Sequence, residues 1–117
     1  MATYLELSNM LDNDYARRRV KVALMIKARN LAAEPEPSDP PISGEPTMAV
    51  WRVRQAMSTR IMKTLDRAVN LAYTHVQQNA TTQLLLAILE PTPTNEAQVD
   101  TALQTLIDDH VESVLLA

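Results

Sequence analysis

The chain has 117 residues, 46% of them hydrophobic, with 11 basic and 14 acidic side chains and a formal net charge of −3. This length suits one compact domain spanning residues 1–117, and the apolar content excludes wholesale disorder. The mild negative charge excludes a general attraction to nucleic acid. The absence of cysteine excludes disulfides, thiolate catalysis and cysteine-based zinc sites.

The composition favours helices over sheets. There is one glycine and no phenylalanine, so a core must be built from Leu, Val, Ile, Met and Ala. We therefore predict an all-α protein, a small bundle of four to five helices. The first residues lack the basic and apolar regions of a signal peptide, and the longest apolar run, Leu84–Leu89, is too short to cross a bilayer. We expect no membrane partner.

The first part of the chain predicts two helices. Thr3 and Glu6 have the spacing of a capping box, which indicates a short helix over residues 4–11. After an acidic break, a second helix is predicted over residues 15–33. Its arginine-rich start leads into the apolar stretch Val22–Ile26, which is typical of a helix covered on several sides.

Residues 34–46 form the clearest boundary in the sequence. They hold five of the seven prolines and the only glycine. Proline removes amide donors and disfavours helical geometry at the residue before it, so neither a helix nor a central strand is expected here. We predict a long, exposed, Pro-rich loop or arm that connects the second and third helices.

Three further elements follow this connection. From Thr47 to about Gln78, apolar residues recur at spacings of three and four, which predicts a long helix. Ser58–Thr59 is a candidate break within it, a point that the pattern leaves open. Residues 82–89 form a short apolar element of undetermined type. A last helix is expected within residues 94–117, with its end extending toward a partner.

Motifs for catalysis are missing from the sequence. It contains no glycine-rich phosphate loop, no H-E-x-x-H and no G-x-S-x-G. His75 and His110 lack carboxylate helpers at helical spacing, so we interpret them as helix-packing or rim residues. Asp108, Asp109 and Glu112 are interpreted as a solvated helix face. We therefore expect no catalytic, cofactor-binding or metal site, and a protein that is not an enzyme.

Charge is segregated along the chain. All the Lys and Arg residues lie between Arg17 and Arg67, and only acidic charges follow. A chain of this kind can present two opposite faces, to its own copies or to different neighbours. The candidate interface or channel residues are Arg17, Arg18, Arg19, Lys21, Arg52, Arg54, Arg60, Lys63, Asp108, Asp109, Glu112, Leu115 and Leu116.

Three interpretations of the basic region remain open: a protein-facing interface, an ordinary solvated face, or a nucleic-acid surface. The first is favoured because the acidic last helix of a neighbouring copy offers a matching surface, and such a contact closes into a ring. Aromatic side chains for stacking are missing apart from Tyr15, and no helix-turn-helix frame is evident. Trp51 is expected either to anchor the core beside the Pro-rich connection, with its indole N–H on a carbonyl or water, or to form an interface hot spot.

The order of these elements resembles the small helical head–tail connector (neck or adaptor) proteins of tailed bacteriophages. The resemblance covers most of the chain and depends on helix type and apolar spacing, with no catalytic signature. The Pro-rich connection departs from the more Ala-rich segment of that family. The segments that carry the resemblance are Thr3–Leu7, Arg17–Leu31, the Trp-containing Met48–Met57, Asp66–Val76 and Val99–Leu116.

The resemblance implies a structural subunit of the virion neck, made in the host cytoplasm. Such subunits form a ring, commonly of about a dozen copies, that extends the DNA channel between the portal and the tail. The expected partners are other copies, the portal protein, the next neck or tail component and, without sequence specificity, DNA in the channel. Reversing the charges of Arg18 and Arg19 is expected to block assembly with helicity intact. The alternative function is a small helical nucleic-acid-binding regulator that uses the basic region 17–67.

Overall fold

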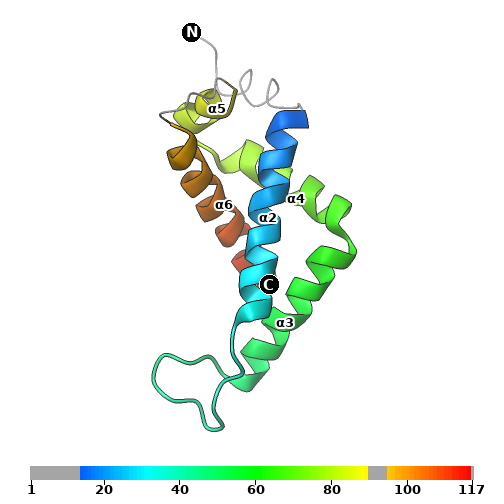
Figure 1. The fold of residues 1–117 in the computed structure, drawn as a ribbon, viewed down its shortest axis with the longest axis vertical. Helices are drawn as coiled ribbons and strands as arrows, with labels where there is room; N and C mark the ends of the chain where they lie inside the picture. The colour runs from blue at the N-terminus through cyan, green and yellow to red at the C-terminus, as the bar shows by residue number, and fades with distance from the viewer. Residues whose placement is uncertain (1–13, 90–94, 117) are drawn as a thin grey trace.

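The computed structural model describes residues 14–89 and 95–116, and within these ranges it contains five α-helices and no strand (Figure 1). The predicted all-α class is therefore confirmed for this part of the chain. The helix expected over residues 4–11 lies outside the described residues. The helices are α2 (Asp14–Ala33), α3 (Met48–Lys63), α4 (Leu65–Asn79), α5 (Thr82–Leu89) and α6 (Glu96–Leu116).

Helix α2 is the central element, because α3, α4 and α6 all pack against it (Figure 1). Its buried side chains recur every three or four residues, with Val20, Leu24 and Leu31 almost fully enclosed. Ala23 and Ala28 are buried between them, and their small side chains let the neighbouring helices approach closely. The molecule is elongated, with principal extents of 55 × 28 × 22 Å.

An elbow at Thr64 divides the predicted long helix into α3 and α4. Thr64 has φ −121° and ψ 43°, outside the helical region, and its hydroxyl donates to the Arg60 carbonyl at 2.8 Å. The candidate break at Ser58–Thr59 is not observed. Ser58 is buried inside α3, where its hydroxyl donates to the Ala28 carbonyl of α2 at 2.7 Å. This hydroxyl therefore links two helices.

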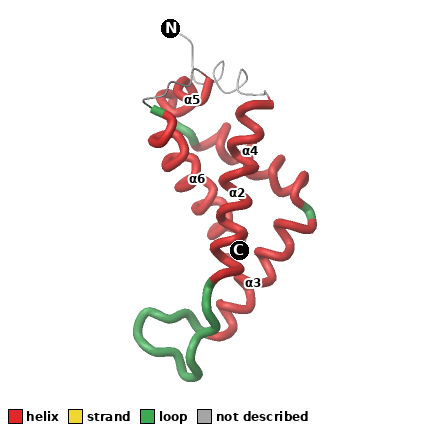
Figure 2. The backbone as a smooth tube through the Cα atoms, in the orientation of Figure 1, coloured by secondary structure: helices red, strands yellow, loops and turns green. Residues whose placement is uncertain are grey.

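The connection between α2 and α3, residues 34–47, contains neither helix nor strand and projects from one end of the molecule (Figure 2). The indole N–H of Trp51 donates to the Glu34 carbonyl at 3.0 Å, so the hydrogen bond expected for this side chain is confirmed. Arg54 pairs with the Glu34 carboxylate at 3.4 Å, and the Gln55 amide donates to the Leu31 carbonyl at 2.7 Å. The start of α3 thus ties down the base of this connection.

Glu45 organises the projecting part of the connection. Its carboxylate accepts the backbone N–H groups of Ser38 at 3.2 Å and of Ile42 at 3.1 Å. The Ile42 N–H, followed by that of Ser38, holds the pKa of Glu45 below its usual value. The N–H of Glu45 donates back to the Ile42 carbonyl at 3.0 Å, which closes a turn with Gly44 at φ +87°. Only glycine adopts such a φ without strain, so this turn needs the chain's single glycine.

The rest of the core joins the later helices to α2. The apolar element over residues 82–89 is a helix, α5, and it packs on α6. Leu85 and Ile88 of α5, with Leu103 and Ile107 of α6, belong to the same buried cluster as the α2 side chains. None of the helices within the described residues combines the length and the apolar character required to cross a membrane.

Candidate protein-interaction surface

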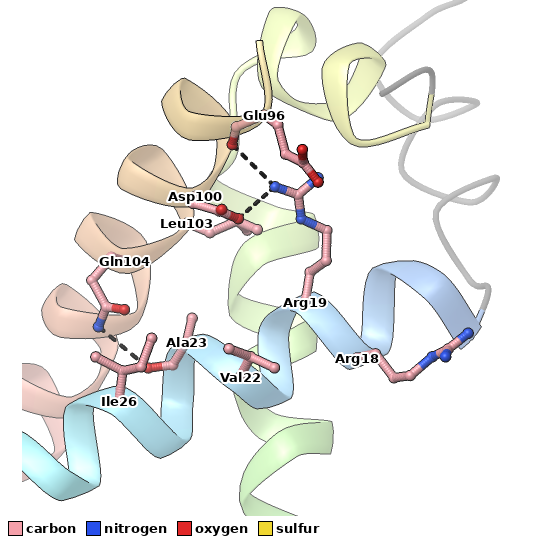
Figure 3. A pocket seen from close by; sticks show the side chains of 9 residues that line it. All are labelled: Arg18, Arg19, Val22, Ala23, Ile26, Glu96, Asp100, Leu103 and Gln104. Atoms are coloured by element: carbon pink, nitrogen blue, oxygen red, sulfur yellow. Dashed lines mark hydrogen bonds and ion pairs between the residues drawn. The ribbon is translucent and has the colours of Figure 1, made fainter. Parts of the chain in front are cut away.

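A groove runs between α2 and α6 and has a volume of ≈370 Å³ (Figure 3). The α2 wall combines two arginines with aliphatic side chains, whereas the α6 wall is mostly polar. The lining residues are Arg18, Arg19, Val22, Ala23 and Ile26 from α2, and Glu96, Asp100, Leu103 and Gln104 from α6.

Arg19 fastens the start of α6 to α2. Its guanidinium donates to the Asp100 carboxylate at 2.5 Å and to the Glu96 carbonyl at 3.2 Å, as Figure 3 shows. The Arg19 side chain is only 10% exposed. Farther along the groove, the Gln104 amide donates to the Ala23 carbonyl at 3.3 Å. Arg19 was predicted as an interface residue, but in this structure it holds two helices of one chain together.

Lys27 makes a second charged link between the same helices. Its amine lies 3.0 Å from the Glu112 carboxylate and 3.9 Å from that of Asp108. The sequence argument paired the basic run with the acidic helix of a neighbouring copy, whereas the structure brings Lys27, Asp108 and Glu112 together within one chain. Asp109, the third member of the acidic cluster, is exposed. Part of the charge segregation therefore serves the fold.

The outward side of α2 combines exposed aliphatic side chains with unpaired cations. Val22 is 56% exposed and Ile26 is 37% exposed. Arg18, Lys21 and Arg29 are exposed beside them, and none of the three forms an ion pair with any described residue. We call these five residues the outer α2 face. An exposed apolar patch with a polar rim is typical of a protein interaction site.

Two of the other predicted basic residues have structural partners. Arg17 donates to the Asn70 side chain at 2.6 Å and lies over the Tyr73 ring, 4.8 Å from its centroid. Arg54 pairs with Glu34, as described above. Arg52 and Lys63 are exposed on α3. Leu115 and Leu116 are the last two residues of α6, and their side chains lie outside the described positions.

A second hollow, of ≈230 Å³, lies at the elbow between α3 and α4, and we call it the elbow cavity. Aliphatic side chains from four helices line it, including Leu71, which is 56% exposed, and Val114. Arg60, Arg67 and His110 also line it, and no carboxylate among the described residues does. The sequence analysis named Arg60 as an interface candidate and counted Arg67 only within the basic region 17–67, because only the bend at Thr64 brings their two helices around one hollow.

His75 of α4 and His110 of α6 form a pair that sequence reasoning treated as two separate residues. Their ring centroids are 5.0 Å apart. Burial, and then the neighbouring His75, lowers the pKa of His110 below its usual value. No group of three or more His, Cys, Asp or Glu residues suited to a metal ion occurs in the parts of the chain that the structure describes.

Acidification should destabilise the protein through His110. Because its pKa is lower in the folded than in the unfolded chain, the unfolded state binds more protons as the pH falls below about 6.5. The stability present at pH 7.5 is therefore lost as the pH falls through the folded pKa of His110. Urea unfolding at pH 7.5 and pH 5 measures this loss. In His110→Gln the difference between the two pH values should shrink; an unchanged difference would assign the pH dependence to other groups.

Comparisons with protein-family models, with curated proteins and with solved structures found no match to this chain. The functional assignment therefore depends on the resemblance given by the sequence and on the surfaces described above.

Proposed function

We propose that the protein is a non-enzymatic structural subunit of a tailed-phage neck, which forms a ring between the portal and the tail and extends the DNA channel. The outer α2 face is the observation that carries this proposal. It exposes Val22 and Ile26 beside three cations that form no ion pair with a described residue, whereas another side of α2 packs against three helices. A lone subunit gains nothing from this exposure, whereas a subunit in an assembly buries it.

In a ring, many weak contacts through this surface add up to a stable assembly. Each copy contributes a modest contact, and the contacts act together once the ring is held on a template, so weak interfaces suffice. The elongated shape, 55 Å in its longest dimension, lets one end meet the portal while the other meets the next neck or tail component. Helix α6, within the segment 94–117, is the element that we propose contacts the portal.

The unpaired cations support contact with DNA in the channel. Arg18, Lys21 and Arg29 of α2 are exposed, as are Arg52 and Lys63 of α3, and each can neutralise a phosphate without reading sequence. The same cations support the alternative function, a helical nucleic-acid-binding regulator. That alternative requires duplex binding by the isolated chain, with an affinity that falls steeply as salt is added.

The direct test mixes the purified chain with the portal protein from the same genome and images the product by electron microscopy. We expect a symmetric ring added to the portal. A portal that stays bare under conditions in which heads mature, or a genome without a portal, would remove the connector proposal. Duplex binding as a function of salt would then decide on the alternative.

A charge-reversal variant tests the outer α2 face itself. Arg18→Glu with Arg29→Glu is expected to weaken ring formation on the portal by about tenfold or more, because complementary charges at an interface become repulsive. Arg19 is left unchanged, since its reversal would break the link to Asp100 and disturb the fold. Far-UV circular dichroism should be unaltered.

The matched control reverses the charges of Arg52 and Lys63, which lie on α3 away from this face. If the α2 variant assembles as well as the wild type, the outer α2 face is not the interface. If both double variants fail equally, the general loss of positive charge is responsible, and the outer α2 face is not a specific protein interface.

A further inference from the structure

The connection between α2 and α3 presents one aliphatic side chain on an acidic background. Residues 34–46 contain Glu34, Glu36, Asp39 and Glu45 and no basic residue. Ile42 is 66% exposed, the highest value among the large hydrophobic side chains of the described residues. An exposed aliphatic side chain on a projecting loop is accessible to a partner, and removing its apolar surface from water would be favourable.

This loop is held in shape before any partner arrives. The Glu45 carboxylate accepts the N–H groups of Ser38 and Ile42, and the turn through Gly44 fixes the backbone next to Ile42. The Trp51 indole and the Glu34 carbonyl close the base of the loop. A pre-organised loop loses little conformational entropy on binding, so even one buried side chain contributes net affinity.

The elbow cavity has the complementary properties. It is lined mainly by aliphatic side chains, and Arg60 and Arg67 are the arginines of its lining. At ≈230 Å³ it is smaller than the roughly 300–1,000 Å³ of typical small-molecule sites, so it suits a single side chain rather than a cofactor. Neither arginine forms an ion pair with a described residue, so both remain available to an acidic loop.

The loop cannot reach the elbow cavity of its own chain. It joins α3 at Met48, whereas the cavity lies at the other end of α3, beside Thr64. The 16 residues of α3 span about 24 Å at 1.5 Å per residue. The base of the loop is fastened to the start of α3 through Trp51, so this separation is fixed.

We propose that Ile42 of one copy inserts into the elbow cavity of the next copy, with Glu36 and Asp39, the loop acids that form no ion pair with a described residue, facing Arg60 and Arg67. Two different patches meet in this contact, so it is heterologous, and repeating it by rotation closes a ring. The inference rests on the proposed self-assembly and names the contact that builds it. It also gives a function to the Pro-rich connection.

Cysteine cross-linking tests the contact cleanly, because the chain has no cysteine of its own. An Ile42→Cys chain is mixed with a Leu71→Cys chain, alone at high concentration and assembled on the portal, under mild oxidation. We expect a disulfide-linked dimer of the two variants. The control pairs Ile42→Cys with Val53→Cys, which is 48% exposed on α3 but does not line the cavity.

Lysine variants give a second readout on the assembled ring. Ile42→Lys and Leu71→Lys should each weaken self-association by about tenfold or more, because a cation would enter an apolar cavity lined in part by arginines. Val53→Lys should assemble normally. A ring that forms on the portal with Ile42→Lys, and without the specific cross-link, overturns this contact while the connector function stands. If neither a ring nor a cross-link forms under any condition, both the Ile42 contact and the connector function are overturned.

Discussion

Leu24→Ala is expected to lower the free energy of unfolding by about 2–5 kcal/mol. Leu24 is 1% exposed at the middle of α2, the helix on which α3, α4 and α6 all pack. Truncation removes buried methyl groups and leaves a cavity, because the three surrounding helices cannot all move inward to fill it. Urea unfolding followed by circular dichroism measures the loss, and the melting temperature should fall by roughly 10 °C or more.

Val22→Ala is the matched control on the same helix. Val22 is more than half exposed, so its truncation should change stability by no more than about 0.5 kcal/mol. A similar loss in both variants would mean that α2 is not the centre of the core. A stable Val22→Ala chain that fails to assemble on the portal would add support to the outer α2 face.

The helix boundaries that local chemistry determines were predicted well. Helix α2 was expected over residues 15–33 and is observed over Asp14–Ala33. Proline follows closely at position 35 and stops a helix through its missing amide hydrogen and its ring, whatever the tertiary structure. Thr47 likewise caps α3, since its hydroxyl accepts the Val50 N–H.

Local chemistry was insufficient to predict the position of the elbow between α3 and α4. Ser58–Thr59 and Thr64 carry the same kind of hydroxyl, and each can compete with helical hydrogen bonds. Packing against α2 engages the Ser58 hydroxyl with the Ala28 carbonyl, so the helix continues there and bends later. The elbow cavity depends on this bend, and its position was therefore beyond the sequence pattern.

Residue spacing also could not predict which basic residues form contacts within the fold and which remain exposed. Arg18 and Arg19 are neighbours with the same chemistry, yet Arg18 is exposed and Arg19 is nearly covered by α6. Which residue turns inward depends on the rotation of α2 against α6, and that rotation is set by apolar packing along the whole helix. The sequence predicted a basic surface, and the structure divides it into links within the fold and cations left for partners.

Lys27→Glu is expected to destabilise the fold by about 1–3 kcal/mol. The Lys27 side chain is only 14% exposed and faces Glu112 and Asp108, so the substitution would place three carboxylates together. The loss stays below that of a fully buried pair, because Glu112 and Asp108 are 37% and 44% exposed and water screens them. Urea unfolding at low and high salt measures both the loss and its electrostatic origin.

The charge-swapped variant, Lys27→Glu with Glu112→Lys, should recover about 1 kcal/mol or more, because the attraction between α2 and α6 is restored with its signs exchanged. Lys21→Glu is the control, since Lys21 is exposed on the same helix without an ion pair to any described residue, and it should change stability by no more than about 0.5 kcal/mol. Equal losses in Lys27→Glu and Lys21→Glu, with no recovery in the swap, would show that the acidic helix is free to pair with another copy. The contacts of α2 and α6 would then belong to the assembly, as charge segregation alone suggests, rather than to the subunit.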